Sequence, residues 1–122
     1  MKQLAEMIIY RKAPSANVIN GWRYKRWYWR IREEKAAWKV LLYSAGSMIS
    51  KATEKRRVEI TLIRKRRIDP DNNSGSVKFL LDMMVSLGWL VDDGVKWIDL
   101  QVEQRNLRKN EPEGAEIKIY AL

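Results

Sequence analysis

One amphipathic segment between two strand-like segments limits the folds that are open to this chain. Residues Ser76–Leu87 place apolar side chains on one helix face, and Gly88 follows as a candidate C-cap. Arg57–Lys65 before it and Trp97–Gln104 after it alternate apolar and polar residues, which is typical of strands. We therefore expect a crossover helix that returns the chain beside the first strand.

The other segments complete an order of β-α-β-α-β-β. Ala5–Tyr10 and Ala115–Leu122 are predicted strands, and Val18–Tyr43 is a predicted helix with Ser15 as its N-cap. Asp69–Gly75 has the composition of a turn. This pattern predicts a mixed α/β (α+β) fold in one small domain, residues 1–122.

The expected helix Val18–Tyr43 has aromatic residues on two faces. One face is expected in the core and comprises Tyr24, Trp27, Ile31, Trp38 and Leu42. Trp22 and Trp29 lie on the opposite face with Val40. They require a second partner: a dimer mate, DNA bases or another part of the fold.

Charge is unevenly distributed along the chain. The net charge is +9, and residues 1–67 hold 18 Lys and Arg against five acids. All six Asp lie between Asp69 and Asp99. A basic surface attracts polyphosphates, and the six Trp and five Tyr favour a nucleic acid over mere solubility as the reason for the charge.

The chain contains neither Cys nor His. This excludes disulfides, thiolate chemistry, zinc fingers and catalysis by a Ser-His-Asp or Cys-His arrangement. A metal site would have only oxygen ligands, which favour Mg²⁺, Mn²⁺ or Ca²⁺. No apolar stretch is long enough for a membrane span or a signal peptide, so we expect an intracellular, cytoplasmic protein without a membrane partner.

The acidic residues form two pairs separated by the expected crossover helix. Asp69 and Asp71 follow a strand, where residues two apart point to the same side, and Asp92 with Asp93 follows the helix. A crossover that brings Asp93 to Asp69 and Asp71 would form a carboxylate site for Mg²⁺ or Mn²⁺. Both pairs are also ordinary turn chemistry, which remains the alternative.

Lys78 lies near the start of the expected helix after these carboxylates. It can contact a phosphate and stabilise charge on a reacting oxygen. Alternatively, it forms an ion pair with Asp82, four residues later on the same helix face.

The ordered combination of these residues resembles the RusA family of Holliday junction resolvases, in the form found in phages and prophages. The similar stretch runs from Arg66 to Asp93 and contains D-x-D-N, then Lys78, then Gly88 and the D-D pair. A second, weaker similarity is P-S-A-N at Pro14–Asn17.

The resemblance implies a homodimeric endodeoxyribonuclease that cuts four-way DNA with Mg²⁺ or Mn²⁺, in recombination and repair. Asp69, Asp71 and Asp93 would be catalytic metal ligands, Asp92 would support or share the ligation, and Lys78 would act at the scissile phosphate. Asn72 would hold the loop or a ligand in place.

A basic run precedes the first carboxylate pair. We expect its members to contact DNA together with Lys78; they are Arg64, Lys65, Arg66 and Arg67. Two non-catalytic alternatives remain open: a protein that binds branched DNA or regulates transcription on the same fold, and a basic RNA-associated structural protein.

Overall fold

A computed structural model describes residues 1–122 as four strands and three helices. Their bounds are β1 Lys2–Ile9, α1 Ala16–Tyr24, α2 Tyr28–Gly46, β2 Arg56–Arg64, α3 Pro70–Ser86, β3 Ile98–Asn106 and β4 Gly114–Ala121. The mixed α/β class and the four predicted strands are confirmed. The order is β-α-α-β-α-β-β, because the first predicted helix is two helices.

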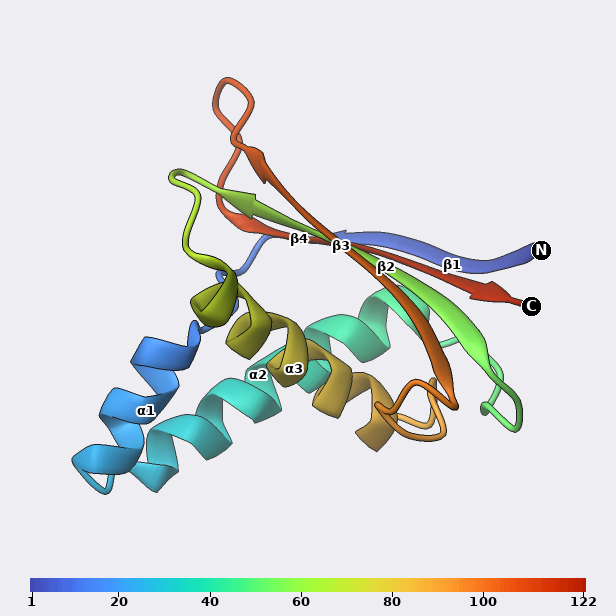
Figure 1. The fold of residues 1–122 in the computed structure, drawn as a ribbon, viewed down its shortest axis with the longest axis horizontal. Helices are drawn as coiled ribbons and strands as arrows, with labels where there is room; N and C mark the ends of the chain where they lie inside the picture. The colour runs from blue at the N-terminus through green and yellow to red at the C-terminus, as the bar shows by residue number, and fades with distance from the viewer.

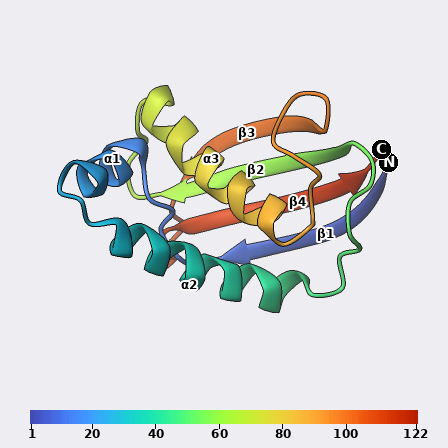
Figure 2. The same cartoon turned by 90° about the horizontal axis from the view of Figure 1, so that it is seen from below.

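The strands form one sheet in the order β1-β4-β2-β3. β4 pairs antiparallel with both β1 and β2, whereas β2 and β3 are parallel. Parallel neighbours require a crossover connection, and α3 provides it, as the sequence predicts (Figure 2). β3 is consequently an edge strand directly beside the strand that leads into Asp69.

All three helices cover one face of the sheet, and the other face is bare (Figure 1). The core lies between the two layers, where alternate strand residues such as Val58, Ile60 and Ile117 meet Trp38 and Leu80 of the helices. The intervening strand residues face solvent, which is why the strand sequences alternate. No helix of the structure has both the length and the apolar character needed to cross a membrane.

The predicted single helix Val18–Tyr43 is wrong, because the helix breaks between α1 and α2. Arg26 adopts a left-handed φ of 58°. The Arg26 N–H donates to the Arg23 carbonyl and the Trp27 N–H donates to that of Trp22, which completes a Schellman C-cap. Ser15 caps α1 as expected, accepting from the Val18 N–H at 3.3 Å.

The break also changes which aromatic residues are buried. Ile31, Trp38 and Leu42 lie in the core as predicted. Tyr24 is 90% exposed and Trp27 is 38% exposed, so their expected burial is wrong. The turn between the two helices projects away from the sheet (Figure 1).

Helix α3 begins six residues earlier than the sequence pattern predicts. Asp69 is its N-cap and Pro70 occupies the first helical position, so the expected turn at Asp69–Gly75 is mostly helix. At the other end, Gly88 adopts a φ of 79° after the C-cap residue Leu87, which confirms its predicted capping role.

Candidate functional site

The first carboxylate pair lies at the N-terminus of α3. The Asp69 side chain accepts from the backbone N–H and from the side-chain amide of Asn72, both at 2.9 Å. These hydrogen bonds, the backbone one first, lower the pKa of Asp69 below its ordinary value. Asp71 lies in the first helical turn, so the two carboxylates are not paired along a strand as expected.

Asp71 differs from Asp69 in its surroundings. It is exposed, and its carboxylate takes part in none of the hydrogen bonds and ion pairs that engage Asp69 and Asp93. An acidic side chain in the first turn also lies in the favourable field of the helix dipole. Asp71 is therefore a carboxylate available to a cation from solution.

The two segments that resemble the family motifs contact each other directly. The Asn17 N–H donates to Oδ1 of Asn72 at 2.8 Å, and the Ser76 hydroxyl donates to the Pro14 carbonyl at 3.0 Å. Between these contacts, a Cβ atom on Gly75 would lie 2.5 Å from that of Ala16. Asn72, Gly75 and Ser76 thus fasten the start of α3 to the start of α1.

Arg64 does not belong to the exposed basic run. Its side chain is buried beneath α3, where Nη2 donates to the Ser76 hydroxyl at 2.9 Å and to Oδ1 of Asn73 at 3.3 Å. Burial lowers the pKa of its guanidinium. The expected DNA contact is corrected to a structural one, because the final residue of β2 points toward the helices. Lys65, Arg66 and Arg67 are exposed.

Lys78 joins α3 to the loop that contains the second acidic pair. Its Nζ lies 3.9 Å from Oδ1 of Asp82, which is the expected ion pair, and 3.1 Å from Oδ2 of Asp93, a partner that the sequence does not predict. The hydrogen bond with Lys78 lowers the pKa of Asp93, and the same bond raises the pKa of Lys78. Asp92 is exposed and accepts from the Asp93 N–H at 2.8 Å.

The structure does not gather Asp69, Asp71 and Asp93 into one group. No cluster of three or more Asp, Glu, His or Cys side chains is close enough to hold a metal ion. Lys78 is seven residues beyond Asp71, about 10 Å along the helix axis, and Asp93 meets the helix at Lys78. The expected three-carboxylate cage is therefore not formed in this arrangement.

The donors nevertheless suit a hard divalent cation. Mg²⁺ is commonly held by one or two carboxylates, with substrate phosphate and water completing its octahedron. Asp71 is unpartnered and Asp69 is adjacent, whereas Asp93 is engaged by Lys78. The residues fit such a site by their chemistry, with two carboxylates at the helix start and the third still engaged by Lys78.

A cleft that no sequence motif predicts lies between the three helices. It has a volume of about 230 Å³ and is lined by polar and apolar residues that include Arg23, Lys35, Lys78 and Asp82. The cationic side chains of Arg23, Lys35 and Lys78 come from three different helices, and they line one cleft only because α1 packs against α3. The sequence contains no signal for it, since 55 residues separate Arg23 from Lys78.

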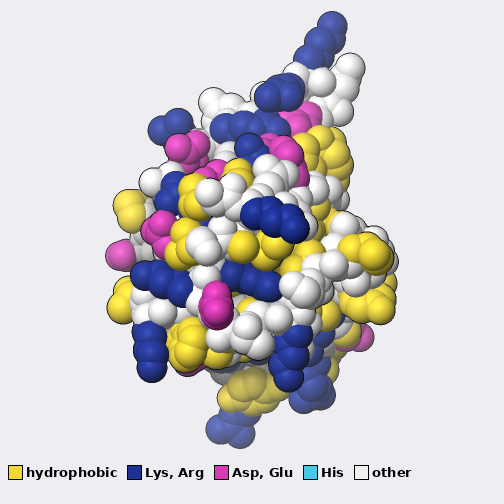
Figure 3. Space-filling view, turned by 90° about the vertical axis from the view of Figure 1, so that its right-hand side faces the viewer, with side chains coloured by type: hydrophobic (Ala, Val, Ile, Leu, Met, Phe, Trp, Pro, Cys, Tyr) yellow, Lys and Arg dark blue, Asp and Glu magenta, His cyan; other side chains and the backbone are white.

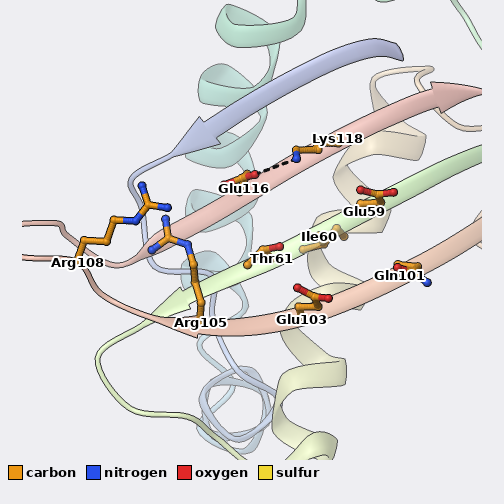
Figure 4. Close-up of a pocket in the computed structure, with 9 residues that line it drawn as sticks. All are labelled: Glu59, Ile60, Thr61, Gln101, Glu103, Arg105, Arg108, Glu116 and Lys118. Atoms are coloured by element: carbon orange, nitrogen blue, oxygen red, sulfur yellow. Dashed lines mark ion pairs between the residues drawn. The ribbon is translucent and has the colours of Figure 1, made fainter. Parts of the chain in front are cut away.

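Basic side chains elsewhere are spread over the surface among hydrophobic ones, as Figure 3 shows for one end of the molecule. The bare face of the sheet holds an open depression of about 300 Å³ (Figure 4). Its charges are of both signs, with Glu59, Glu103 and Glu116 close to Arg105 and Lys118. This mixture favours neither a polyanion nor a cation.

No family model matches the chain, and comparisons with curated proteins and with solved structures find no match. The resemblance to the RusA family therefore rests on the motif residues themselves.

Proposed function

We propose that this chain is a RusA-like, Mg²⁺- or Mn²⁺-dependent endodeoxyribonuclease that acts on four-way DNA junctions in the cytoplasm. The observation that supports it most is the direct contact between Pro14–Asn17 and Asn72–Ser76. Two separate sequence motifs meet at the helix end that presents Asp69 and Asp71. Lys78 shares a helix face with Asp71, because seven residues make nearly two full turns.

In this proposal, each side chain at the site has its own role in phosphodiester hydrolysis. Asp69 and Asp71 would hold a divalent ion, and Asn72 fixes the Asp69 carboxylate through two hydrogen bonds. Lys78 exchanges its partner Asp93 for the phosphate and neutralises charge that grows on its oxygens. A divalent ion supplies an activated water in such reactions, which a chain without His otherwise lacks.

DNA would be bound mainly through its phosphates. Lys65, Arg66 and Arg67 lie exposed just before Asp69, and Arg23 and Lys35 line the cleft that reaches Lys78. Contacts of this kind weaken as salt rises, because bound counterions are released on association. Paired nicks in a symmetric junction require two sites related by a two-fold axis, so the proposal includes a homodimer.

The proposal is tested by incubating a labelled four-way junction with the wild type and with Asp71→Asn, in Mg²⁺, Mn²⁺ or EDTA. Glu103→Gln is the control, since it removes one exposed carboxylate from the bare sheet face. We expect paired nicks with the wild type and the control, and none with Asp71→Asn or EDTA. Unchanged cleavage by Asp71→Asn overturns the proposal.

A second candidate function is a non-catalytic protein that binds branched DNA on the same fold. The observation that favours it is the Lys78–Asp93 ion pair, which leaves no three-carboxylate group. It predicts that junctions are retarded in a gel equally with Mg²⁺ and EDTA, and are never cut.

A further inference from the structure

The turn between α1 and α2 exposes an unusual run of aromatic residues. Every residue from Arg23 to Arg30 is exposed. Four of the eight are aromatic: Tyr24, Trp27, Tyr28 and Trp29. A folded domain ordinarily buries rings of this size, and a contiguous exposed group of them marks an interaction surface. We call residues Trp22–Arg30 the aromatic turn.

The aromatic turn has an ordered backbone. The Trp27 N–H donates to the Trp22 carbonyl at 2.7 Å, and the Arg30 N–H donates to the Trp27 carbonyl at 3.0 Å. Arg26 holds a left-handed φ of 58°, which a long side chain adopts only where the surrounding structure maintains it. The rings are thus presented by a preformed corner between two helices.

Cations accompany the rings. The Arg30 guanidinium lies 5.6 to 5.8 Å from the ring centroids of Trp22, Trp27 and Trp29, and Lys25 Nζ lies 4.5 Å from that of Trp27. Residues 22–30 include four Lys and Arg and no acid. Exposed aromatic faces within a positive field are the features by which proteins bind single-stranded nucleic acids, through base stacking and phosphate contacts.

The location of the aromatic turn also favours a polyanion. Arg23 belongs both to the turn and to the cleft that Lys35 and Lys78 line, so cations continue from the rings toward the candidate site. A second copy of the chain is a poorer occupant. A two-fold interface would place the four cations of one turn against the same four of its mate.

We propose that the aromatic turn is a separate nucleic-acid site that stacks unpaired bases, with Arg30 and Lys25 beside the strand's phosphates. Trp27 and Trp29 are the stacking residues, since both are exposed and lie at the start of α2. Binding at the aromatic turn requires neither cleavage nor a metal ion. It can therefore be tested independently of the proposed endonuclease activity.

The test is a titration of tryptophan fluorescence in EDTA with two probes of equal length and charge: an oligothymidylate and an abasic deoxyribose-phosphate oligomer. We expect quenching by the first and a preference for it of about tenfold, since stacking is lost when the bases are absent. Trp27→Ala/Trp29→Ala should abolish the preference yet keep the weak binding of the abasic probe. Tyr43→Ala is the control, as an exposed ring far along α2.

Trp27→Phe/Trp29→Phe keeps aromatic faces and should retain most of the preference, which separates stacking from a folding defect. Equal binding of the two probes by the wild type overturns the proposal. So does an unchanged preference in the Ala variant. Wild-type self-association that the Ala variant loses, or quenching by anionic vesicles without quenching by oligothymidylate, would assign the rings to another partner and also overturn it.

Discussion

The ammonium of Lys78 lies 3.1 Å from a carboxylate oxygen of Asp93, 15 positions away in the sequence. This contact fastens the loop after α3 to the middle of that helix. It also occupies the third carboxylate of the candidate site with a cation that belongs to the chain itself. Asp71, on the same helix face as Lys78, has no such partner.

Lys78→Gln is expected to raise the pKa of Asp93 toward the ordinary range of an aspartate. The hydrogen bond with Lys78 is the largest cause of its lowered value. A carboxyl group whose pKa is lower in the folded than in the unfolded protein stabilises the fold at pH values above its unfolded-state pKa. This stabilisation is lost as the pH falls through the folded-state pKa. Carboxyl carbon NMR titration measures the shift directly. Lys96→Gln, an exposed cation in the same loop, should leave Asp93 unchanged.

Gly75→Ala is expected to destabilise the protein by about 1–3 kcal/mol, the usual cost of forcing an extra methyl into a packed contact. The new Cβ would lie 2.6 Å from the Ala16 backbone nitrogen, so α1 must move away from α3. Urea denaturation measures the loss. Gly21→Ala lies in α1 with open space around it and should instead stabilise by roughly 1 kcal/mol. Equal effects of the two substitutions would contradict the close approach at Gly75.

Ser76→Ala is expected to cost about 1–3 kcal/mol, because it leaves a buried donor of Arg64 and the Pro14 carbonyl without this partner. Nε of Arg64 already lacks a hydrogen-bond partner, so the substitution would leave a second nitrogen of this buried guanidinium with fewer hydrogen bonds. Ser74→Ala, two residues earlier and exposed, should change the free energy of unfolding by less than about 0.5 kcal/mol. Comparable losses at both positions would argue against the buried network.

Glu111 is expected to make stability pH-dependent on the acid side. Its carboxylate accepts from Arg105 at 2.7 and 2.8 Å, from the Arg108 N–H at 3.0 Å and from the Tyr10 hydroxyl at 3.1 Å. These bonds, Arg105 first, lower its pKa from 4.5 to about 2. The folded state is thus favoured fully above pH 4.5, and the advantage disappears as pH falls toward 2.

Glu111→Gln should therefore lower the Tm near neutral pH, and the Tm difference from the wild type should shrink on acidification through this window. Thermal melts at a series of pH values measure it. Glu113→Gln, in the same loop, is the matched control, because its carboxylate accepts only a 3.4 Å hydrogen bond from the Lys65 N–H and lies 3.9 Å from Lys12 Nζ. A constant difference across the series would refute the assignment.

Two helix ends show what local sequence reveals. Helices α1 and α3 both end in a Schellman cap, with the same pair of backbone hydrogen bonds. At α3 the left-handed residue is Gly88, and the helix end was predicted. At α1 the left-handed residue is Arg26. An arginine does not indicate a helix end, so the predicted helix continues past this position.

Local sequence patterns were sufficient to predict the four strands, the crossover helix, the mixed α/β class and the caps at Ser15 and Gly88. These follow from periodic burial and backbone preference, which act between neighbours in the chain. Tertiary contacts set the break at Arg26, the burial of Arg64 and the pairing of Asp93 with Lys78. These three features depend on the packing of α1 against α3 and on the path of the loop after α3. The free energy that stabilises them therefore comes from contacts between residues far apart in the sequence.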